Sequence, residues 1–389
     1  KGYEAQVFLD IHEVADGAAG RWARLHHELK GRGVPDPEAA VMDIYLAELY
    51  APLTELFDPG WINSFCGYLR DRRNTGPEAA VPDWDALTRQ VRKSAEAFIA
   101  AARKYLGGAG FDPFEAAGTY SPVDPEQIWG IFAAYLKRMV LLAEIGPSAG
   151  ICCEDEREAL WRLDRVEYAV YALGYGVLSL LRPVIGQGAA GAAAGALGDH
   201  WQLNRKLEDA FAAFGIPQSR SRRALAVMKA VLVRTATENP EESAGTPPSA
   251  AWSPPPPEAL ARYLALENYD AEDIRSLLGV NLFDDVIWFN KEAFEEFLSL
   301  APLFLVLEDP AALRGGRGTA GADTAKWREW MDLVFRTAEF FRKAEAVSEY
   351  RLDRLIEALS GETGLGGSGK ESARSPKKTG AGKGKKKRT

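Results

Sequence analysis

The chain has 389 residues, with 47 basic and 55 acidic side chains and a formal net charge of −8. Hydrophobic residues make up 47% and charged residues 26%, which excludes a wholly disordered chain, a collagen-like fibre and a disulfide scaffold. Because 60 alanines stand against 13 isoleucines, the composition favours helix over strand. We expect a mostly α protein, a helical bundle-like fold in two helical parts, with a short N-terminal strand left from an upstream domain.

The first half of the chain predicts one strand followed by helices. Residues Gln6–Ile11 alternate in hydrophobicity as a strand does, whereas later apolar residues recur every three or four positions, as in helices. The sequence Asp-Pro-Glu occurs at 36–38 and again at 124–126, and each occurrence predicts the start of a helix. Asp can cap the N-terminal end of the helix, Pro fits its first turn, and the negative charge of Glu is stabilised at the positive end of the helix dipole. We expect helices near residues 18–30, 36–52, 87–105, 124–142, 153–181, 200–214 and 220–235.

Proline and glycine mark the expected interruptions. Pro52 should bend or end the helix that starts at Pro37. The alanine- and glycine-rich segment Gly186–Gly198 is expected to be flexible on composition, and Gly215–Pro217 should separate two helices. The proline-rich residues 237–257 predict a linker, used either as a spacer or as a polyproline II ligand.

Helices are expected again after this linker. Asp284 and Asp285 could form a turn, and Asn290 is a candidate N-cap for a helix that begins at Lys291. The large side chains around that cap, Trp288 and Phe294 above all, are expected to be buried. An apolar stripe over residues 327–359 predicts one last helix of about nine turns, packed into the core.

These interruptions divide the chain into four expected parts. They are an N-terminal helical domain (1–236, the strand at 6–11 and then helices), a Pro-rich linker (237–257), a C-terminal helical domain (258–360) and a disordered basic tail (361–389). Residues 370–389 carry nine basic side chains and one acid, a net charge of +8 that leaves the rest of the chain at −16. The tail predicts either a solubilising role or weak nonspecific nucleic-acid binding, because no aromatic residues accompany its lysines.

No group of residues has the spacing of a catalytic or metal site. Cys66, Cys152 and Cys153 lack Cys-x-x-Cys spacing and predict small buried thiols in a reducing compartment, hence a cytoplasmic protein. His26 and His27 are neighbours on a helix and point about 100° apart, so they cannot share a ligand. We therefore assign no catalytic, cofactor-binding or metal-ligating residue and expect no cofactor. No apolar stretch reaches the length of a membrane helix, so no membrane partner is expected.

Three stretches stand out in the sequence. The first comprises Gln6–Asp10, Gly31–Pro35 and the helix through Leu56, the second Leu203–Leu207 and Val227–Val233, and the third Leu278–Asn281 and Trp288–Glu296. Together they resemble the region that follows the catalytic barrel in very large bacterial α-amylase-family glycoside hydrolases. The clearer parts, residues 6–57 and 268–305, cover less than a quarter of the chain and carry no catalytic signature.

The resemblance implies a non-catalytic C-terminal accessory region of such an enzyme, acting in α-glucan metabolism. Its implied partners are the upstream catalytic barrel of the same polypeptide and, as a further candidate, the α-glucan. The family's nucleophile ends a barrel strand in a Gly-x-Arg-x-Asp motif. Residues 162–164 and 351–353 both read Arg-Leu-Asp, but both fall in expected helices, so no catalytic residue is carried over.

The first residue, Lys1, is not methionine, which fits a fragment of a longer enzyme. The alternative is a stand-alone helical protein-interaction module with a basic disordered tail. An upstream barrel in the same reading frame would favour the enzyme fragment, and a start codon directly before Lys1 would favour the stand-alone module.

Overall fold

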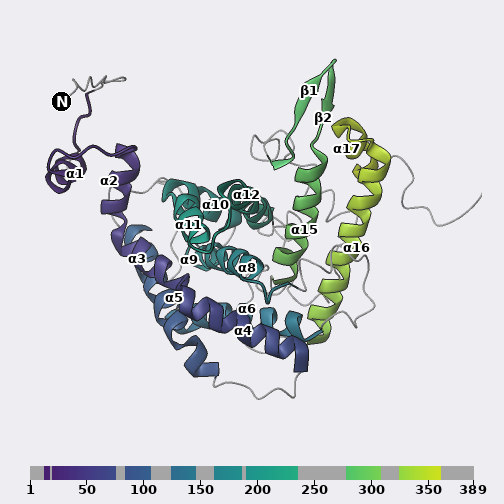
Figure 1. Ribbon diagram of the computed structural model, residues 1–389, viewed down its shortest axis with the longest axis horizontal. Helices are drawn as coiled ribbons and strands as arrows, with labels where there is room; N and C mark the ends of the chain where they lie inside the picture. Colours follow the sequence, from purple (N-terminus) through teal and green to yellow (C-terminus); the bar gives the residue numbers. More distant parts are fainter. Residues whose placement is uncertain are drawn as a thin grey trace, which may run out of the picture.

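The computed structural model describes residues 13–17, 20–75, 84–106, 124–145, 162–185, 190–234, 277–307 and 324–360. These residues are mostly helical and contain one two-stranded antiparallel sheet, which confirms the expected mostly α fold (Figure 1). The first helices are α1 (Arg21–Leu29), α2 (Pro37–Tyr45), α3 (Ala47–Leu56), α4 (Pro59–Thr75), α5 (Trp84–Leu106) and α6 (Pro125–Ile145). They are followed by α8 (Val166–Ser179), α9 (Leu181–Ile185), α10 (Ala190–His200), α11 (Leu203–Ala213) and α12 (Gln218–Arg234). The last elements are β1 (Asn281–Phe283), β2 (Val286–Trp288), α15 (Lys291–Leu307), α16 (Thr324–Ser348) and α17 (Leu352–Ser360).

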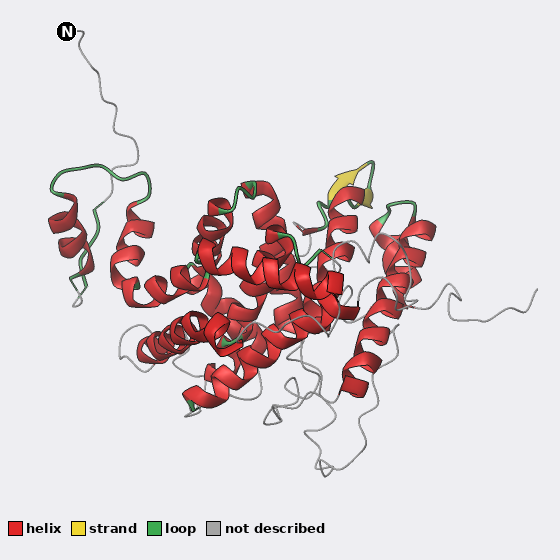
Figure 2. Cartoon of the chain, turned by 60° about the horizontal axis from the view of Figure 1, so that its bottom comes forward, coloured by secondary structure: helices red, strands yellow, loops and turns green. Residues whose placement is uncertain are grey.

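The helices pack around α8, in which every residue from Ala169 to Leu178 is buried. Helices α4, α10, α11, α12 and α15 all contact α8, while α3 packs along α5 and α4 along α6. Helices α1 and α2 lie at one end of the molecule, and α15, α16 and the two strands lie at the opposite end (Figures 1 and 2). None of the described helices is both long and apolar enough to cross a membrane.

Two glycines let aromatic rings approach the backbone of α8. A Cβ atom added at Gly174 would lie 2.9 Å from Cζ of Phe211 in α11, and one at Gly176 would lie 2.8 Å from Cε1 of Tyr135 in α6. The Tyr135 hydroxyl donates a hydrogen bond of 2.7 Å to the carbonyl oxygen of Ala172. The neighbouring helices therefore stand closer to α8 than a side chain at these positions would allow.

Local signals located several helix ends correctly. Oδ1 of Asp36 accepts a hydrogen bond of 2.9 Å from the amide of Ala39, and Oδ1 of Asn290 accepts one of 2.8 Å from the amide of Ala293. Both predicted N-caps are thereby confirmed. Gly215 adopts a φ of 75° between α11 and α12, which confirms the predicted break there.

Two expectations about interruptions are wrong. Pro52 lies inside α3, and the break falls at Leu46, between α2 and α3. The proline ring is buried, while the exposed position of Glu48 lets water solvate the carbonyl that Pro52 leaves without a donor. Residues 190–198 of the alanine- and glycine-rich segment form most of α10, because alanine favours helix and α10 packs against α9 and α12.

Two helices that were expected to be continuous are interrupted. The segment expected to be helical over residues 153–181 contains a turn at 162–165, and α8 begins only at Val166. The last apolar stripe is divided into α16 and α17 by Glu349 and Tyr350, which have φ values of 52° and 63°. The stripe is still buried on both sides of this break, because α17 packs against α16.

A β-hairpin that was not predicted precedes α15. Strand β1 pairs antiparallel with β2, and Asn281 stands opposite Trp288. Asp284 and Asp285 form the expected turn between the strands, with φ values of 54° and 59°. Left-handed values at both turn residues suit the twist of a two-residue hairpin, and Asp tolerates them better than most residues do.

Trp288 and Phe294 lie in different surroundings, although both were expected in the core. Trp288 is 36% exposed, so its expected burial is wrong. Successive strand residues point to opposite faces, and Ile287 packs against the core, so Trp288 lies on the outer face of the hairpin. Phe294 is buried, as expected, with its ring centre 6.2 Å from those of Phe297 and Phe341.

Helices from both expected domains contact each other directly. Nε of Arg138 in α6 donates a hydrogen bond of 2.7 Å to the carbonyl oxygen of Leu307 in α15. The ring of Tyr175 in α8 stacks on Phe304 in α15, with ring centres 4.9 Å apart. The division into two domains stays a prediction, because the linker between them lies outside the described residues. Also outside lie the strand at 6–11, Cys152, Cys153, residues 235–276 and the basic tail at 361–389.

The close approach at Gly176 can be tested against a glycine with free space around it. Gly176→Ala should destabilise the protein by about 1–3 kcal/mol, because the added methyl group would meet the Tyr135 ring. Gly130→Ala in α6 is the matched control, since nothing lies within 4 Å of its added Cβ atom. This control should leave stability unchanged or raise it by up to about 1 kcal/mol. Urea denaturation followed by circular dichroism measures both, and equal effects would contradict the packing described for α8.

The two aromatic residues beside the Asn290 cap give a second comparison. Phe294→Ala should lower the free energy of unfolding by about 3–5 kcal/mol, because it empties a buried site. Trp288→Ala should lower it by less than Phe294→Ala does, since 36% of Trp288 is already exposed to water. Thermal and urea unfolding of both variants measure the difference. A larger loss for Trp288→Ala than for Phe294→Ala would show that the indole is part of the core.

Candidate functional site

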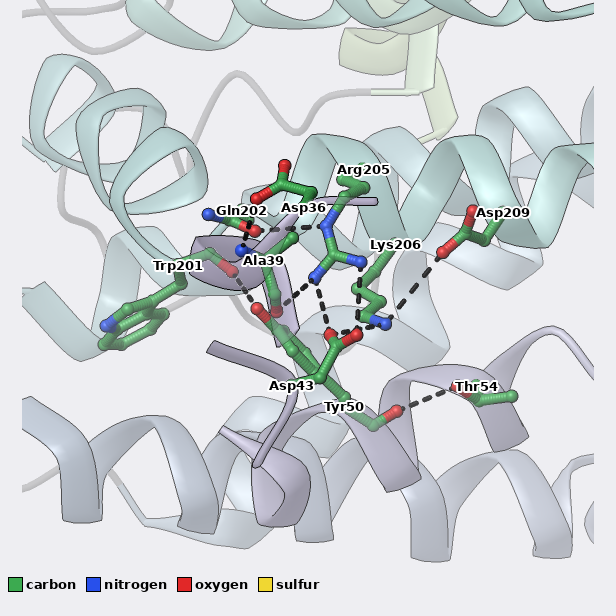
Figure 3. Close-up of polar contacts among 10 residues, drawn as sticks. All are labelled: Asp36, Ala39, Asp43, Tyr50, Thr54, Trp201, Gln202, Arg205, Lys206 and Asp209. Carbon is green, nitrogen blue, oxygen red and sulfur yellow. Dashed lines mark hydrogen bonds and ion pairs between the residues drawn. The ribbon is translucent and has the colours of Figure 1, made fainter. Parts of the chain in front are cut away.

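An ion-pair cluster joins α2 to α11 (Figure 3). Asp43 in α2 accepts hydrogen bonds from two consecutive basic residues of α11, with Oδ1 lying 2.5 Å from Nη2 of Arg205 and 2.7 Å from Nζ of Lys206. Nη2 of Arg205 also donates to the carbonyl oxygen of Ala39 at 3.4 Å. Asp43, Arg205 and Lys206, together with Tyr50 of α3, are called the Asp43 cluster below.

Tyr50 is the buried member of the Asp43 cluster. Its hydroxyl donates a hydrogen bond of 2.8 Å to the carbonyl oxygen of Trp201, close to the start of α11, and Nζ of Lys206 lies 4.8 Å from its ring centre. Burial raises the pKa of Tyr50 to about 12, so its phenol stays protonated at neutral pH. Tyr50 therefore acts as a fixed hydrogen-bond donor that ties α3 to the start of α11.

The backbone before α11 helps to position the two cations. Gln202 has a left-handed φ of 48° directly before the helix, and its Oε1 accepts a hydrogen bond of 3.0 Å from Nε of Arg205. Consecutive residues of a helix point about 100° apart, so Arg205 and Lys206 both reach Asp43 only because their side chains are long. Asp209, farther along α11, lies 3.9 Å from Nζ of Lys206 and is mostly exposed.

The negative charge of Asp43 is paired with the positive charges of Arg205 and Lys206. Partial burial by itself would raise the pKa of Asp43, but the hydrogen bonds and positive charges of Arg205 and Lys206 outweigh it and hold the pKa below its usual range. The carboxylate is therefore charged and already bonded to its two cations at neutral pH. This arrangement suits a cross-link between helices better than a site for proton transfer.

A second candidate is an apolar surface on the β-hairpin. Leu282 and Phe283 are 71% and 72% exposed, and Trp288 and Tyr350 are also exposed. Phe283 and Trp288 share one face of the hairpin, because Trp288 stands opposite Asn281, two residues from Phe283. Leu282, next to Phe283 in the strand, lies on the opposite face. The exposed side chains on both faces, Leu282, Phe283 and Trp288, are together with Tyr350 called the hairpin surface below. Exposed apolar side chains gathered in this way are typical of binding surfaces.

The carboxylates of the two Arg-Leu-Asp segments are both bound by arginines. Oδ1 of Asp164 lies 3.0 Å from Nη1 of Arg73 in α4. Oδ2 of Asp353 lies 2.5 Å from Nη2 of Arg351. Asp164 lies in a turn and Asp353 in the first turn of α17, so neither carboxylate ends a strand.

Cys66, His26 and His27 belong to neither candidate site, whereas His200, the last residue of α10, directly precedes Trp201, whose carbonyl oxygen bonds Tyr50. Cys66 is buried in α4, and burial raises the pKa of its thiol to about 11. His26 and His27 are exposed on α1. Among the residues that the structure describes, no three His, Cys, Asp or Glu side chains are grouped closely enough to hold a metal ion.

Sequence reasoning missed both candidate sites. Asp43 and Arg205 are 162 residues apart, and no spacing rule joins residues that far apart. The hairpin had a readable signal, since Asp284-Asp285 lies between two short segments of β-forming residues.

No protein-family model, curated protein or solved structure matches the chain.

The pH dependence of stability tests the Asp43 cluster. Asp43→Asn should lower the free energy of unfolding at neutral pH by about 0.5–1 kcal/mol, because it removes the charge between two cations at a partly exposed site. Since folding lowers the pKa of Asp43, its contribution is present above the unfolded-state pKa of about 3.9 and is lost as the pH falls through the folded-state value. The parent and the variant should therefore converge in acid.

Asp209→Asn is the matched control, because Asp209 lies at the exposed rim of the same cluster. It should change stability by less than about 0.3 kcal/mol at any pH. Urea titrations of the parent and both variants between neutral and acidic pH measure these differences. A loss for Asp43→Asn that did not depend on pH, or an equal loss for Asp209→Asn, would contradict this account.

Proposed function

We propose that the chain is a non-catalytic C-terminal accessory region of an α-amylase-family glycoside hydrolase that acts in α-glucan metabolism in the cytoplasm. The observation that carries this proposal is the Asp43 cluster. Asp43 belongs to the first stretch that resembles the family, and Arg205 and Lys206 belong to the second. Two stretches far apart in the sequence thus meet in one contact, which is expected if the resemblance reflects a shared helical framework.

The surroundings of the Arg-Leu-Asp carboxylates support the non-catalytic part of the proposal. Glycoside hydrolysis requires two carboxyl groups that flank the scissile bond, one of them free to attack or to activate water. Asp164 and Asp353 are instead paired with Arg73 and Arg351. In this proposal the chemistry belongs to an upstream catalytic barrel of the same polypeptide, which is the main partner of this region, with α-glucan as a further ligand.

The coding sequence upstream of Lys1 tests the proposal directly. We expect an in-frame barrel with a pair of carboxylates at the ends of its strands. The 389-residue chain alone should release no reducing sugar from soluble α-glucan. Deleting it from the longer enzyme should leave turnover of a short soluble maltooligosaccharide unchanged and lower the melting temperature of the barrel.

A matched variant of the longer enzyme separates loss of the region from an unrelated effect of the deletion. The Asp209→Asn variant changes only the exposed rim of the Asp43 cluster and should melt like the parent enzyme. A start codon directly before Lys1, or α-glucan hydrolysis by the isolated chain, would contradict the proposal.

The second candidate function is a stand-alone helical protein-interaction module. The hairpin surface favours it, because Leu282 and Phe283 offer apolar area that other described residues do not cover. The basic tail would then supply weak, nonspecific attraction to nucleic acid. The same upstream sequence discriminates the two candidates, since a stand-alone module requires its own start codon.

A further inference from the structure

Strand β1 has one edge that no other described segment pairs with. The two strands form a sheet of their own, in the order β1–β2. The outer edge of β2 is covered, because Trp288 bridges to Arg351 and the amide of Phe289 donates a hydrogen bond of 3.0 Å to the carbonyl oxygen of Tyr350. The outer edge of β1 is therefore the place where this sheet can be extended.

The hairpin register shows which backbone groups face that edge. In a hairpin with a two-residue turn, the residues that flank the turn exchange hydrogen bonds, and the next pair points its backbone groups away from the partner strand. Phe283 and Val286 flank the turn, and Leu282 and Ile287 form the next pair. The N–H and C=O groups of Leu282 therefore point outward from β1.

We propose that β1 pairs antiparallel with β1 of a second copy of this chain, around a two-fold axis at Leu282. The Leu282 residues of the two copies then exchange both N–H···O=C hydrogen bonds. The product is a continuous four-stranded antiparallel sheet in which the order is β2–β1 of one copy followed by β1–β2 of the other. Such an interface is isologous, as in most homodimers.

The pairing places the exposed side chains of the hairpin in complementary rows. On one face, Ile287 and Leu282 of one copy continue into Leu282 and Ile287 of the other, so four aliphatic side chains lie in one row. Ile287 already packs against the core of its own copy, which fixes one end of that row. On the opposite face, Phe283 comes next to Asn281 of the second copy, with Trp288 of that copy in the same row.

The charges at the hairpin turn favour the antiparallel arrangement. Asp284 and Asp285 directly follow β1. Antiparallel pairing around Leu282 sends the two acidic turns to opposite ends of the new sheet, whereas parallel pairing would place four carboxylates side by side. Like charges that face each other across strands are destabilising, so the acidic turn selects the direction of the second copy.

The small size of the surface sets the expected strength of the dimer. Stable interfaces bury about 800 Å² on each partner, and three-residue strands with their neighbouring rings offer less than that. We therefore expect reversible association with a dissociation constant on the order of 10 μM.

Sedimentation velocity over a range of concentrations tests the dimer with the complete 389-residue chain. The parent should shift from monomer to dimer, and Leu282→Lys should weaken association at least about tenfold, because a lysine at the two-fold axis faces its own copy. Val14→Lys is the matched control, since Val14 is also an exposed apolar residue, 42% accessible, but precedes α1 and is not part of the hairpin. It should associate like the parent.

Disulfide trapping tests the register of the pairing. Leu282→Cys should form a covalent dimer under mild oxidation, because the two Leu282 Cα atoms would lie about 5.5 Å apart, within the range that a disulfide spans. Asn281→Cys should not, since residue 281 faces residue 283 of the second copy. The mixture of Asn281→Cys with Phe283→Cys should form a covalent heterodimer. The parent, which retains Cys66, Cys152 and Cys153, is the oxidation control.

Several outcomes would overturn the proposal. They are a parent that stays monomeric to about 100 μM, a Leu282→Lys variant that associates as tightly as the parent, or equal trapping of Asn281→Cys and Leu282→Cys. A monomeric parent whose binding to soluble α-glucan is lost in Leu282→Lys would instead assign the surface to a sugar. None of these results affects the proposed function, which depends on the upstream coding sequence.

Discussion

Helix α8 is buried along ten consecutive residues, Ala169–Leu178, and the other helices are placed by how closely they can approach it. A buried helix satisfies most of its backbone N–H and C=O groups by hydrogen bonds within the helix. The neighbouring helices therefore need only exclude water from its surface and fill the space around it. At Gly174 and Gly176 that space is filled by the rings of Phe211 and Tyr135. The Tyr135 hydroxyl finds its partner in an α8 carbonyl, so the ring brings no unpaired donor into the core.

Both candidate sites are positioned from α8. Helix α11 reaches α8 through Phe211, and the same helix carries Arg205, which holds α2 through Asp43. Helix α15 reaches α8 through the stacking of Phe304 on Tyr175, and the hairpin directly precedes α15. The ion-pair cluster and the hairpin surface thus lie on different sides of one packed centre. A change that loosens α8 should disturb both, whereas a change in either one should leave the other intact.

The sequence was informative where a structure depends on neighbouring residues and uninformative where it depends on distant ones. The caps at Asp36 and Asn290 and the break at Gly215 follow from local hydrogen bonding and backbone freedom, and all three were predicted. The helical state of residues 190–198 was missed because it depends on packing against α9 and α12. The Asp43 cluster was missed for the same reason, since its members are brought together by the tertiary fold.

The Cys66 thiol and the Tyr50 phenol both stay protonated near neutral pH. Burial raises the pKa of Cys66 to about 11 and that of Tyr50 to about 12, so thiolate and phenolate scarcely form. Asp43 stays charged, but two cations already match its charge. The hairpin, in contrast, presents apolar side chains and a backbone edge without a described partner. A surface of this kind selects its partner by shape and by strand pairing.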